Sequence, residues 1–225
     1  MIGVVGLAAY NWWVLVPFQA GLLRSPNGFF SDLEVPGQPD AAIMQHLDLL
    51  AGVLLLIALL LRGSSGRKVA RRAEWSWMLV FAVAGIIGER FPYTCSEGTS
   101  PTCRALEWHF QLPVHHYVHI VSGIAEFVAL TVAAVLAHRR TKGDSTIEAS
   151  VHRFVVVALK VGYPLLGVAY LTDRLGVFVE PIFFLAFTAM AAAVLFEPRF
   201  TRSVVEERTH GRTVRSPARH VRLWP

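Results

Sequence analysis

Four histidines precede one long apolar segment of this 225-residue chain. They are His109, His115, His116 and His119, and an almost uncharged run follows from residue 120 to residue 137. Imidazole is the side chain most suited to bind a metal ion or to move protons near neutral pH. Ionisable groups in or beside a membrane helix are candidates for function. The cluster therefore indicates metal or proton chemistry where a membrane helix meets water.

Helical spacing selects among these histidines. Residues three or four apart share one face of a helix, so one stripe holds His115, His119, Ser122 and Glu126. Two imidazoles one turn apart can share a zinc ion with a ligand from another segment, although the H-E-x-x-H form with its built-in base is absent. His46, about one turn inside another apolar segment, is the leading third ligand.

A zinc ion held by three histidines lowers the pKa of its bound water to about 7. The resulting hydroxide is a nucleophile. Asp32, next to Ser31, is the candidate base or further ligand. Asp48 lies two residues after His46 and points roughly 160° away around the helix, so only one of the two faces inward. Other acidic residues on this predicted side include Glu34, Asp40, Glu89, Asp173 and Glu180.

Other interpretations of these residues stay open. Any one histidine can be a headgroup contact or part of a structural hydrogen-bond network. A haem protein would use His46 and His119 as axial ligands. A small transporter would use mid-membrane charges and a helix broken near Pro164, whereas an accessory subunit would need none of these residues.

Glu126 and Lys160 each lie near the middle of an apolar segment. A charge at that depth costs at least about 2.5 to 3.5 kcal/mol on insertion. Because consecutive antiparallel helices bring the two residues to similar depth, the sequence predicts that they pair. The pair is either a structural ion pair or a proton relay beneath the histidines.

Composition indicates an integral membrane protein. Hydrophobic residues make up 54% of the chain and charged residues 16%, too few to coat a soluble globule of this size. Six segments close to the ~20 residues that cross a bilayer predict an all-α helix bundle. They are residues 2–23, 43–61, 74–90, 115–137, 153–172 and 177–196. The first is interpreted as a span rather than a cleaved signal, because no Lys or Arg precedes Arg24.

Basic residues predict the orientation, since they prefer cytoplasmic loops. They concentrate in residues 62–72, 139–142 and 199–222, which places both termini in the cytoplasm of a bacterial plasma membrane. We expect a membrane domain at residues 1–198 and a disordered basic tail at 199–225. The net charge of +5 belongs to these loops rather than to a nucleic-acid-binding face. Membrane lipids are the expected partners, and no protein partner is assigned.

The only two cysteines, Cys95 and Cys103, share one loop on the predicted outer side. Such a pair is oxidised outside the cytosol, which predicts a disulfide. Zinc binding or redox activity is less consistent with the spacing, because neither the short C-x-x-C motif nor a second such pair is present.

Short motifs resemble a bacterial polytopic family known as domain of unknown function nine-nine-eight. They are Phe29-Phe30-Ser31-Asp32-Leu33, Phe91-Pro92, Cys95 with Cys103-Arg104-Ala105-Leu106-Glu107, and the segment from His115 to Ser122. The resemblance implies a membrane bundle of six or seven helices and brings no established reaction.

A looser likeness is to the transmembrane hydrolases that include alkaline ceramidases, which place a Ser, an Asp and three His around zinc. The nearest equivalents here are Ser31, Asp32, His46, His115 and His119. This likeness implies hydrolysis of a lipid amide or ester, with Asp32 as base and Ser31 steadying the oxyanion.

Overall fold

The structure is a computed structural model that describes residues 1–15, 29–39, 41–64, 72–98, 100–172 and 176–196. Every regular element in the described residues is helical. The helices are α1 (Ile2–Tyr10), η1 (Trp12–Leu15), η3 (Phe30–Glu34), α3 (Ala41–Ser64), α5 (Ala73–Arg90), α6 (Pro101–Trp108), α7 (Val114–Arg140), α8 (Ile147–Thr172) and α9 (Gly176–Phe196). The predicted all-α class is therefore confirmed.

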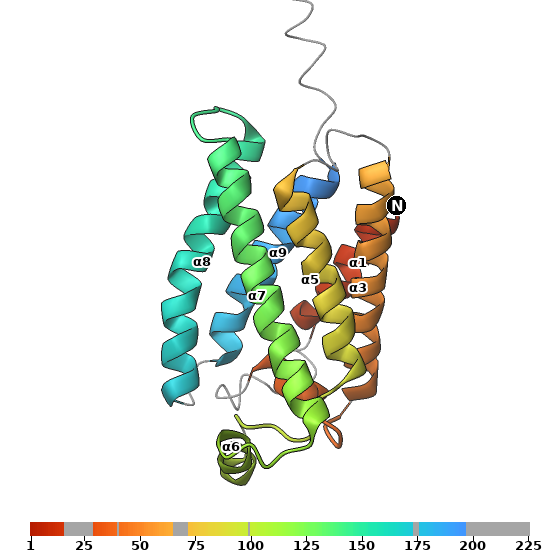
Figure 1. The fold of residues 1–225 in the computed structure, drawn as a ribbon, viewed down its shortest axis with the longest axis vertical. Coiled ribbons are helices and arrows are strands. Elements are labelled where there is room, and N and C mark those ends of the chain that lie inside the picture. Colours follow the sequence, from red (N-terminus) through yellow and green to blue (C-terminus); the bar gives the residue numbers. More distant parts are fainter. Residues whose placement is uncertain (16–28, 40, 65–71, 99, 173–175, 197–225) are drawn as a thin grey trace, which may run out of the picture. The chain divides into compact units, whose positions relative to one another are not determined.

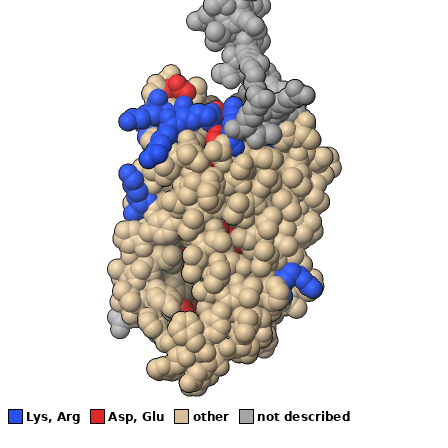
Figure 2. All heavy atoms as spheres, viewed as in Figure 1, with Lys and Arg blue, Asp and Glu red and all other residues tan. Residues whose placement is uncertain are grey.

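Within the described residues, four helices are long and apolar enough to cross a membrane, namely α3, α7, α8 and α9. Their exposed faces are apolar, as Val121, Ile124 and Val128 of α7 illustrate. Figure 2 shows that most of the bundle surface in this view carries neither acidic nor basic side chains. A surface of this kind is solvated by lipid tails rather than by water. The chain is therefore a multi-pass membrane protein that contacts membrane lipids.

The predicted first span, residues 2–23, is not one continuous helix. Helix α1 ends at Tyr10, and nine residues rise only about 14 Å, about half of a bilayer core. Asn11 follows, and its side-chain amide donates to the Leu7 carbonyl at 2.7 Å and to Thr188 Oγ1 at 2.9 Å. A side chain that bonds to nearby backbone competes with the helix, which explains the break. Residues 16–23 lie outside the described residues, as does the tail at 199–225.

Small residues let α5 and α7 pack closely along their length, and Figure 1 shows the two helices side by side. Four alanines of α7 are fully buried, at positions 129, 133, 134 and 137. On α5, a Cβ atom built at Gly88 would lie 3.5 Å from Ser122 Cβ. Small side chains at helix contacts are the usual means of close approach in membranes.

Helix α9 packs through large aromatic side chains instead. Phe187 stacks on Phe81 of α5 with ring centroids 4.0 Å apart, and Phe183 meets Phe127 of α7 edge-on at 4.8 Å. These rings keep the backbone of α9 away from the α3, α5 and α7 backbones. Space for a cavity remains between the two sets of helices.

The two ends of the bundle differ in charge. Helix α7 ends in Arg139 and Arg140, followed by Lys142, and Figure 2 shows Lys and Arg gathered at this end. We call it the arginine end. The opposite end holds α6 and the start of α7 (Figure 1).

Cys95 and Cys103 form a disulfide at that opposite end, which we call the disulfide end. Ser100 begins α6 by accepting a hydrogen bond from the Cys103 amide at 3.2 Å, and Pro101 occupies the first turn. A serine cap and a proline at this position are favourable helix starts. The predicted disulfide is confirmed, and α6 is held against the beginning of α7.

Candidate functional site: a carboxylate-lined cavity

The structure does not bring together the three histidines predicted to bind zinc. His46 is exposed on α3, where its Nδ1 bonds to the Ala42 carbonyl of its own helix. His115 is exposed at the start of α7 and contacts Thr94 Oγ1 at 3.1 Å. Only His119 faces the interior cavity. Among the described residues these imidazoles form no common metal site, and His46 does not face His119 as a haem ligand would.

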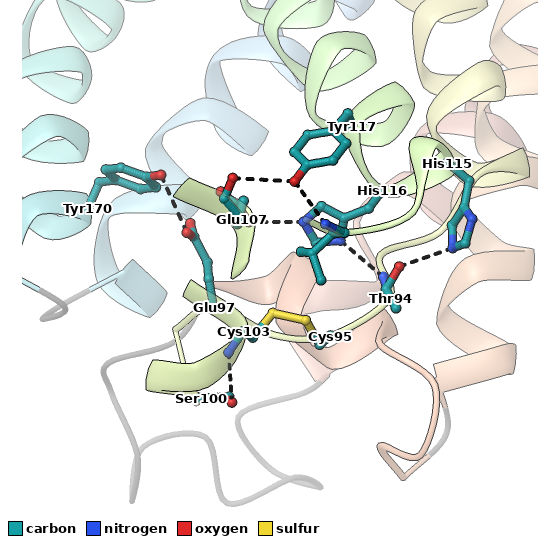
Figure 3. The surroundings of a disulfide bond; sticks show 11 residues. Thr94, Cys95, Glu97, Ser100, Cys103, Glu107, His115, His116, Tyr117 and Tyr170 are labelled. Carbon is teal, nitrogen blue, oxygen red and sulfur yellow. Dashed lines mark hydrogen bonds and ion pairs between the residues drawn. A yellow bond between two sulfur atoms is a disulfide. The ribbon is translucent and has the colours of Figure 1, made fainter. Parts of the chain in front are cut away.

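Among the four clustered histidines the fully buried one is His116, which holds the disulfide loop to α7 (Figure 3). Its Nε2 lies 2.9 Å from Glu107 Oε2 of α6, and its Nδ1 accepts from the Thr94 amide at 3.2 Å. Because a backbone amide can only donate, Nδ1 is unprotonated and Nε2 carries the proton that Glu107 accepts. His116 is therefore a structural link rather than a metal ligand.

His119 lies beneath that link and lines the cavity. Its Nδ1 donates to the Gly88 carbonyl of α5 at 3.0 Å, and its ring lies 4.0 Å from the ring of Tyr93. Tyr93 also lines the cavity and contacts the ring of His116 at 5.0 Å. The disulfide loop thus supplies one wall of the cavity through Tyr93.

The cavity has a volume of about 170 Å³ and lies among α1, η3, α3, α5, α7 and α9. Its wall is chemically divided. Polar residues at the disulfide end are Ser31, Glu34, Asp48, Glu89, Tyr93, His119 and Glu180, whereas aromatic and aliphatic residues such as Phe81, Leu130 and Phe187 form the rest. Five carboxyl groups line it in all, with Glu126 as the fifth, and the described lining residues include no Lys or Arg.

Three of these carboxyl groups converge. One oxygen from each of Glu34, Asp48 and Glu89 lies within 4.8 Å of the other two. Oxygens no more than 4.8 Å apart have a common centre at most about 2.8 Å from each, close to the 2.3 to 2.6 Å of calcium coordination. We call these residues the carboxylate triad. A small inward movement of the side chains would complete three contacts to one hard cation.

Each residue of the triad is positioned by a different segment of secondary structure. Glu34 ends the short helix η3, whose first turn is fixed by Asp32 accepting the Phe29 amide at 2.8 Å. Asp48 lies in the second turn of α3, where its Oδ1 accepts from Trp12 Nε1 at 2.7 Å. Glu89 lies in the last turn of α5. Three separate segments therefore supply the triad.

Two oxygens of the triad lack hydrogen-bond partners among the described residues. They are the buried Oε2 atoms of Glu34 and Glu89. Burial, and then the adjacent carboxyl groups of Glu89 and Asp48, raise the pKa of Glu34 well above its usual range. Like charges this close cannot all remain ionised in a poorly solvated cavity unless a proton or another cation neutralises them. The arrangement favours uptake of a cation.

The predicted pair of Glu126 and Lys160 is not formed. Glu126 lines the cavity, whereas Lys160 is exposed on α8, a helix that does not line it. The described part of the chain contains no ion pair between them. Similar depth in the membrane does not make Glu126 and Lys160 pair, because the two side chains point in different directions around their helices.

The predicted catalytic residues Ser31 and Asp32 occupy different environments. Ser31 lines the cavity, while Asp32 is buried and stabilises the start of η3. Of the predicted α7 stripe, His119 and Glu126 reach the cavity, Ser122 is buried against α5, and His115 lies outside.

Comparison with known proteins extends over nearly the whole helical part. Residues 2–197 match the family described as Protein of unknown function (DUF998). The chain belongs to this family. The resemblance of its Ser-Asp turn, Phe-Pro segment and histidine-led helix is thereby confirmed. Neither the curated proteins nor the solved structures contain a match to this DUF998 chain.

The residues that sequence reasoning undervalued are Glu34, Asp48 and Glu89. All three were visible as acidic residues at or near the outer ends of apolar segments. The available signal was that acidic residues outnumber basic residues on that side. Histidine spacing within one helix was more conspicuous than acidic residues spread over three segments.

Proposed function

We propose that this DUF998 protein binds a hard divalent cation of the calcium class at the carboxylate triad, inside the membrane bundle. The observation that carries the proposal is the convergence of the Glu34, Asp48 and Glu89 oxygens within 4.8 Å. Calcium takes six to eight oxygen ligands, so water in the cavity would supply the remainder. Magnesium is less suitable, because it requires oxygens at about 2.0 to 2.1 Å.

The distribution of charge along the bundle indicates which side of the membrane the triad faces. Basic residues at the arginine end favour placing that end in the cytoplasm of a cell membrane, which puts the triad toward the outside. The disulfide supports the same orientation, because such bonds persist outside the cytosol. On this arrangement the cation enters from the external medium, past the loop that carries Tyr93.

Hydrolysis of a lipid amide or ester receives no support from a histidine-bound zinc, because the imidazoles do not converge. Cation binding is the function that the geometry supports best. A bound ion would draw Glu34, Asp48 and Glu89 together and so couple η3, α3 and α5. The protein would then respond to, or carry, the cation that it binds.

Terbium luminescence tests the proposal, because Tb³⁺ replaces calcium and is excited by a nearby indole. Trp12 donates to Asp48 at 2.7 Å and is therefore well placed as the donor. Purified full-length protein should show saturable Tb³⁺ emission that calcium displaces. Glu89→Gln should weaken binding about tenfold or more, since charge count sets calcium affinity.

Glu97→Gln is the matched control, because Glu97 lies in the disulfide loop outside the triad. It removes one carboxylate from the same end of the bundle and should leave Tb³⁺ affinity unchanged. Equal Tb³⁺ affinity in wild type and Glu89→Gln, with both folded, would refute the triad as the binding site.

A further inference from the structure

The half of the cavity toward the arginine end contains a further carboxyl group in apolar surroundings, that of Glu126. Glu126 lies twelve residues from the start of α7, about 18 Å along the helix. Phe127, the next residue, also lines the cavity, as do Phe81 of α5 and Phe183 and Phe187 of α9. A carboxylate in this setting is costly unless a proton or another cation neutralises it.

Two glycines make room around Glu126. A Cβ atom built at Gly85 of α5 would lie 2.8 Å from Glu126 Oε1, so the carboxyl group rests directly against this glycine. A Cβ built at Gly123, nearly one turn before Glu126 on α7, would meet nothing within 4 Å, and Gly123 lines the cavity. The space beside the carboxyl group is therefore open.

Aromatic rings surround this space in fixed arrangements. Phe183 meets Phe127 at 4.8 Å, Phe187 stacks on Phe81 at 4.0 Å, and Tyr10 meets Phe187 at 4.4 Å. The faces of aromatic rings carry partial negative charge and attract cations, while their area suits alkyl groups. This part of the cavity therefore combines the negative charge of a Glu126 carboxylate with apolar contacts from the rings.

We propose that this half of the cavity binds an aliphatic ammonium ion, with its charge on Glu126 and its alkyl chain among the phenylalanine rings. The proposal goes beyond the metal binding assigned above, because it names an organic ligand class for a separate part of the same cavity. One water needs about 10 to 15 Å³ of such space, so a cavity of about 170 Å³ admits a ligand of several heavy atoms.

Other ligand classes fit this half less well. A metal ion would find one carboxyl group here, because the triad is the metal-binding cluster among the described residues. An anionic lipid headgroup would meet the carboxyl group of Glu126, and no Lys or Arg among the described lining residues would attract it. A neutral alkyl chain would contact the rings but would form no ion pair with Glu126.

Hexylammonium, hexanol and hexanoate form a matched probe set, because they share one chain and differ in charge. Full-length protein in nanodiscs of zwitterionic lipid is titrated by calorimetry, with empty nanodiscs subtracted. We expect saturable binding of hexylammonium, and binding of hexanol and hexanoate at least about tenfold weaker. Equal affinity for hexylammonium and hexanol would overturn the proposal.

Two substitutions locate the binding. Glu126→Gln keeps the shape of the side chain and should reduce hexylammonium affinity about tenfold or more, the scale of losing one partner of a buried charge pair. Gly123→Leu fills the open space without touching the charge and should abolish binding. Unchanged hexylammonium affinity in both folded variants would exclude this half of the cavity.

The triad supplies the internal control. Glu89→Gln should weaken Tb³⁺ binding while hexylammonium still binds, and Glu126→Gln should do the reverse. Loss of hexylammonium binding with Tb³⁺ binding retained confirms Glu126 as its site. A protein that binds Tb³⁺ but never hexylammonium refutes the ammonium site alone, whereas the opposite result refutes the metal site alone.

Discussion

Buried carboxyl groups occur at both ends of this bundle, but their surroundings differ. At the arginine end, Arg140 bonds through Nε to Glu74 at 2.6 Å and through Nη2 to Glu148. This joins α5, α7 and α8. At the disulfide end, Glu34, Asp48 and Glu89 face one another across a cavity lined by no described Lys or Arg.

The comparison separates structural charges from ligand-binding charges. A buried carboxylate with a fixed guanidinium partner is neutralised within the fold and ties helices together. Carboxylates that share a cavity and leave oxygens unbonded destabilise the empty protein, so a proton or a bound cation must neutralise them. The first arrangement predicts loss of stability when one partner is removed, and the second predicts loss of binding.

Arg140→Ala should produce the largest change in stability. It leaves Glu74, which is 4% exposed, without its guanidinium partner. Loss of one partner of a buried pair costs about 3 to 5 kcal/mol, and the partial exposure of Arg140 lowers our expectation to about 2 kcal/mol. Thermal unfolding in detergent measures this, with the adjacent exposed Arg139→Ala as control. A midpoint equal to that of Arg139→Ala would mean that the arginine end is not held by this network.

A smaller, pH-dependent effect should distinguish the triad. Burial first, then Glu89 and Asp48, raise the pKa of Glu34, so its favourable state is protonated. A raised carboxyl pKa stabilises the fold at low pH, and that contribution is lost as pH rises through the folded-state value. The unfolding midpoint of metal-free protein should therefore fall as pH rises above about 4.5, the ordinary Glu value.

Glu34→Gln should weaken this pH dependence, and saturating calcium should oppose it in wild type. Glu97 provides the comparison, because burial and then Glu107 raise its pKa to about 8 outside the triad. Glu97→Gln should keep the calcium effect. If calcium stabilises Glu34→Gln as much as wild type at high pH, the triad does not bind the ion.

The smallest effect is expected from Lys160→Met. Lys160 is exposed on α8 and does not pair with Glu126, so its loss should change stability by no more than about 0.5 kcal/mol. Chemical or thermal unfolding of the two proteins side by side would measure it. A loss of stability as large as that of Arg140→Ala would support the Glu126–Lys160 ion pair predicted from the sequence.

Much of the fold was predictable because its determinants are local. Apolar runs of span length predicted the positions of α3, α5, α7, α8 and α9 closely, and the two cysteines predicted their disulfide. In the described part of the predicted first span, helix α1 ends at Tyr10, and the hydrogen bond from Asn11 to the Leu7 carbonyl accounts for this break, which average hydropathy does not register. The choice of four, five or six crossings depends on α1 and α5, whose length or charge makes them borderline.

The candidate site was only partly predictable. The phase of α3 correctly implied that His46 and Asp48 cannot both face inward, yet sequence reasoning chose His46, and the structure places Asp48 at the cavity. Helical periodicity gives angles between residues on one helix, but it does not give the rotation of that helix against its neighbours.

The sequence by itself determined a helical membrane protein with a disulfide at one end and basic loops at the other. Those properties follow from hydropathy, loop charge and cysteine chemistry, which act over one segment at a time. Only the tertiary structure decided that Glu34, Asp48 and Glu89 converge and that His46 and His115 do not. Convergence depends on how η3, α3 and α5 rotate and pack, and that packing is set by aromatic and glycine contacts across the bundle.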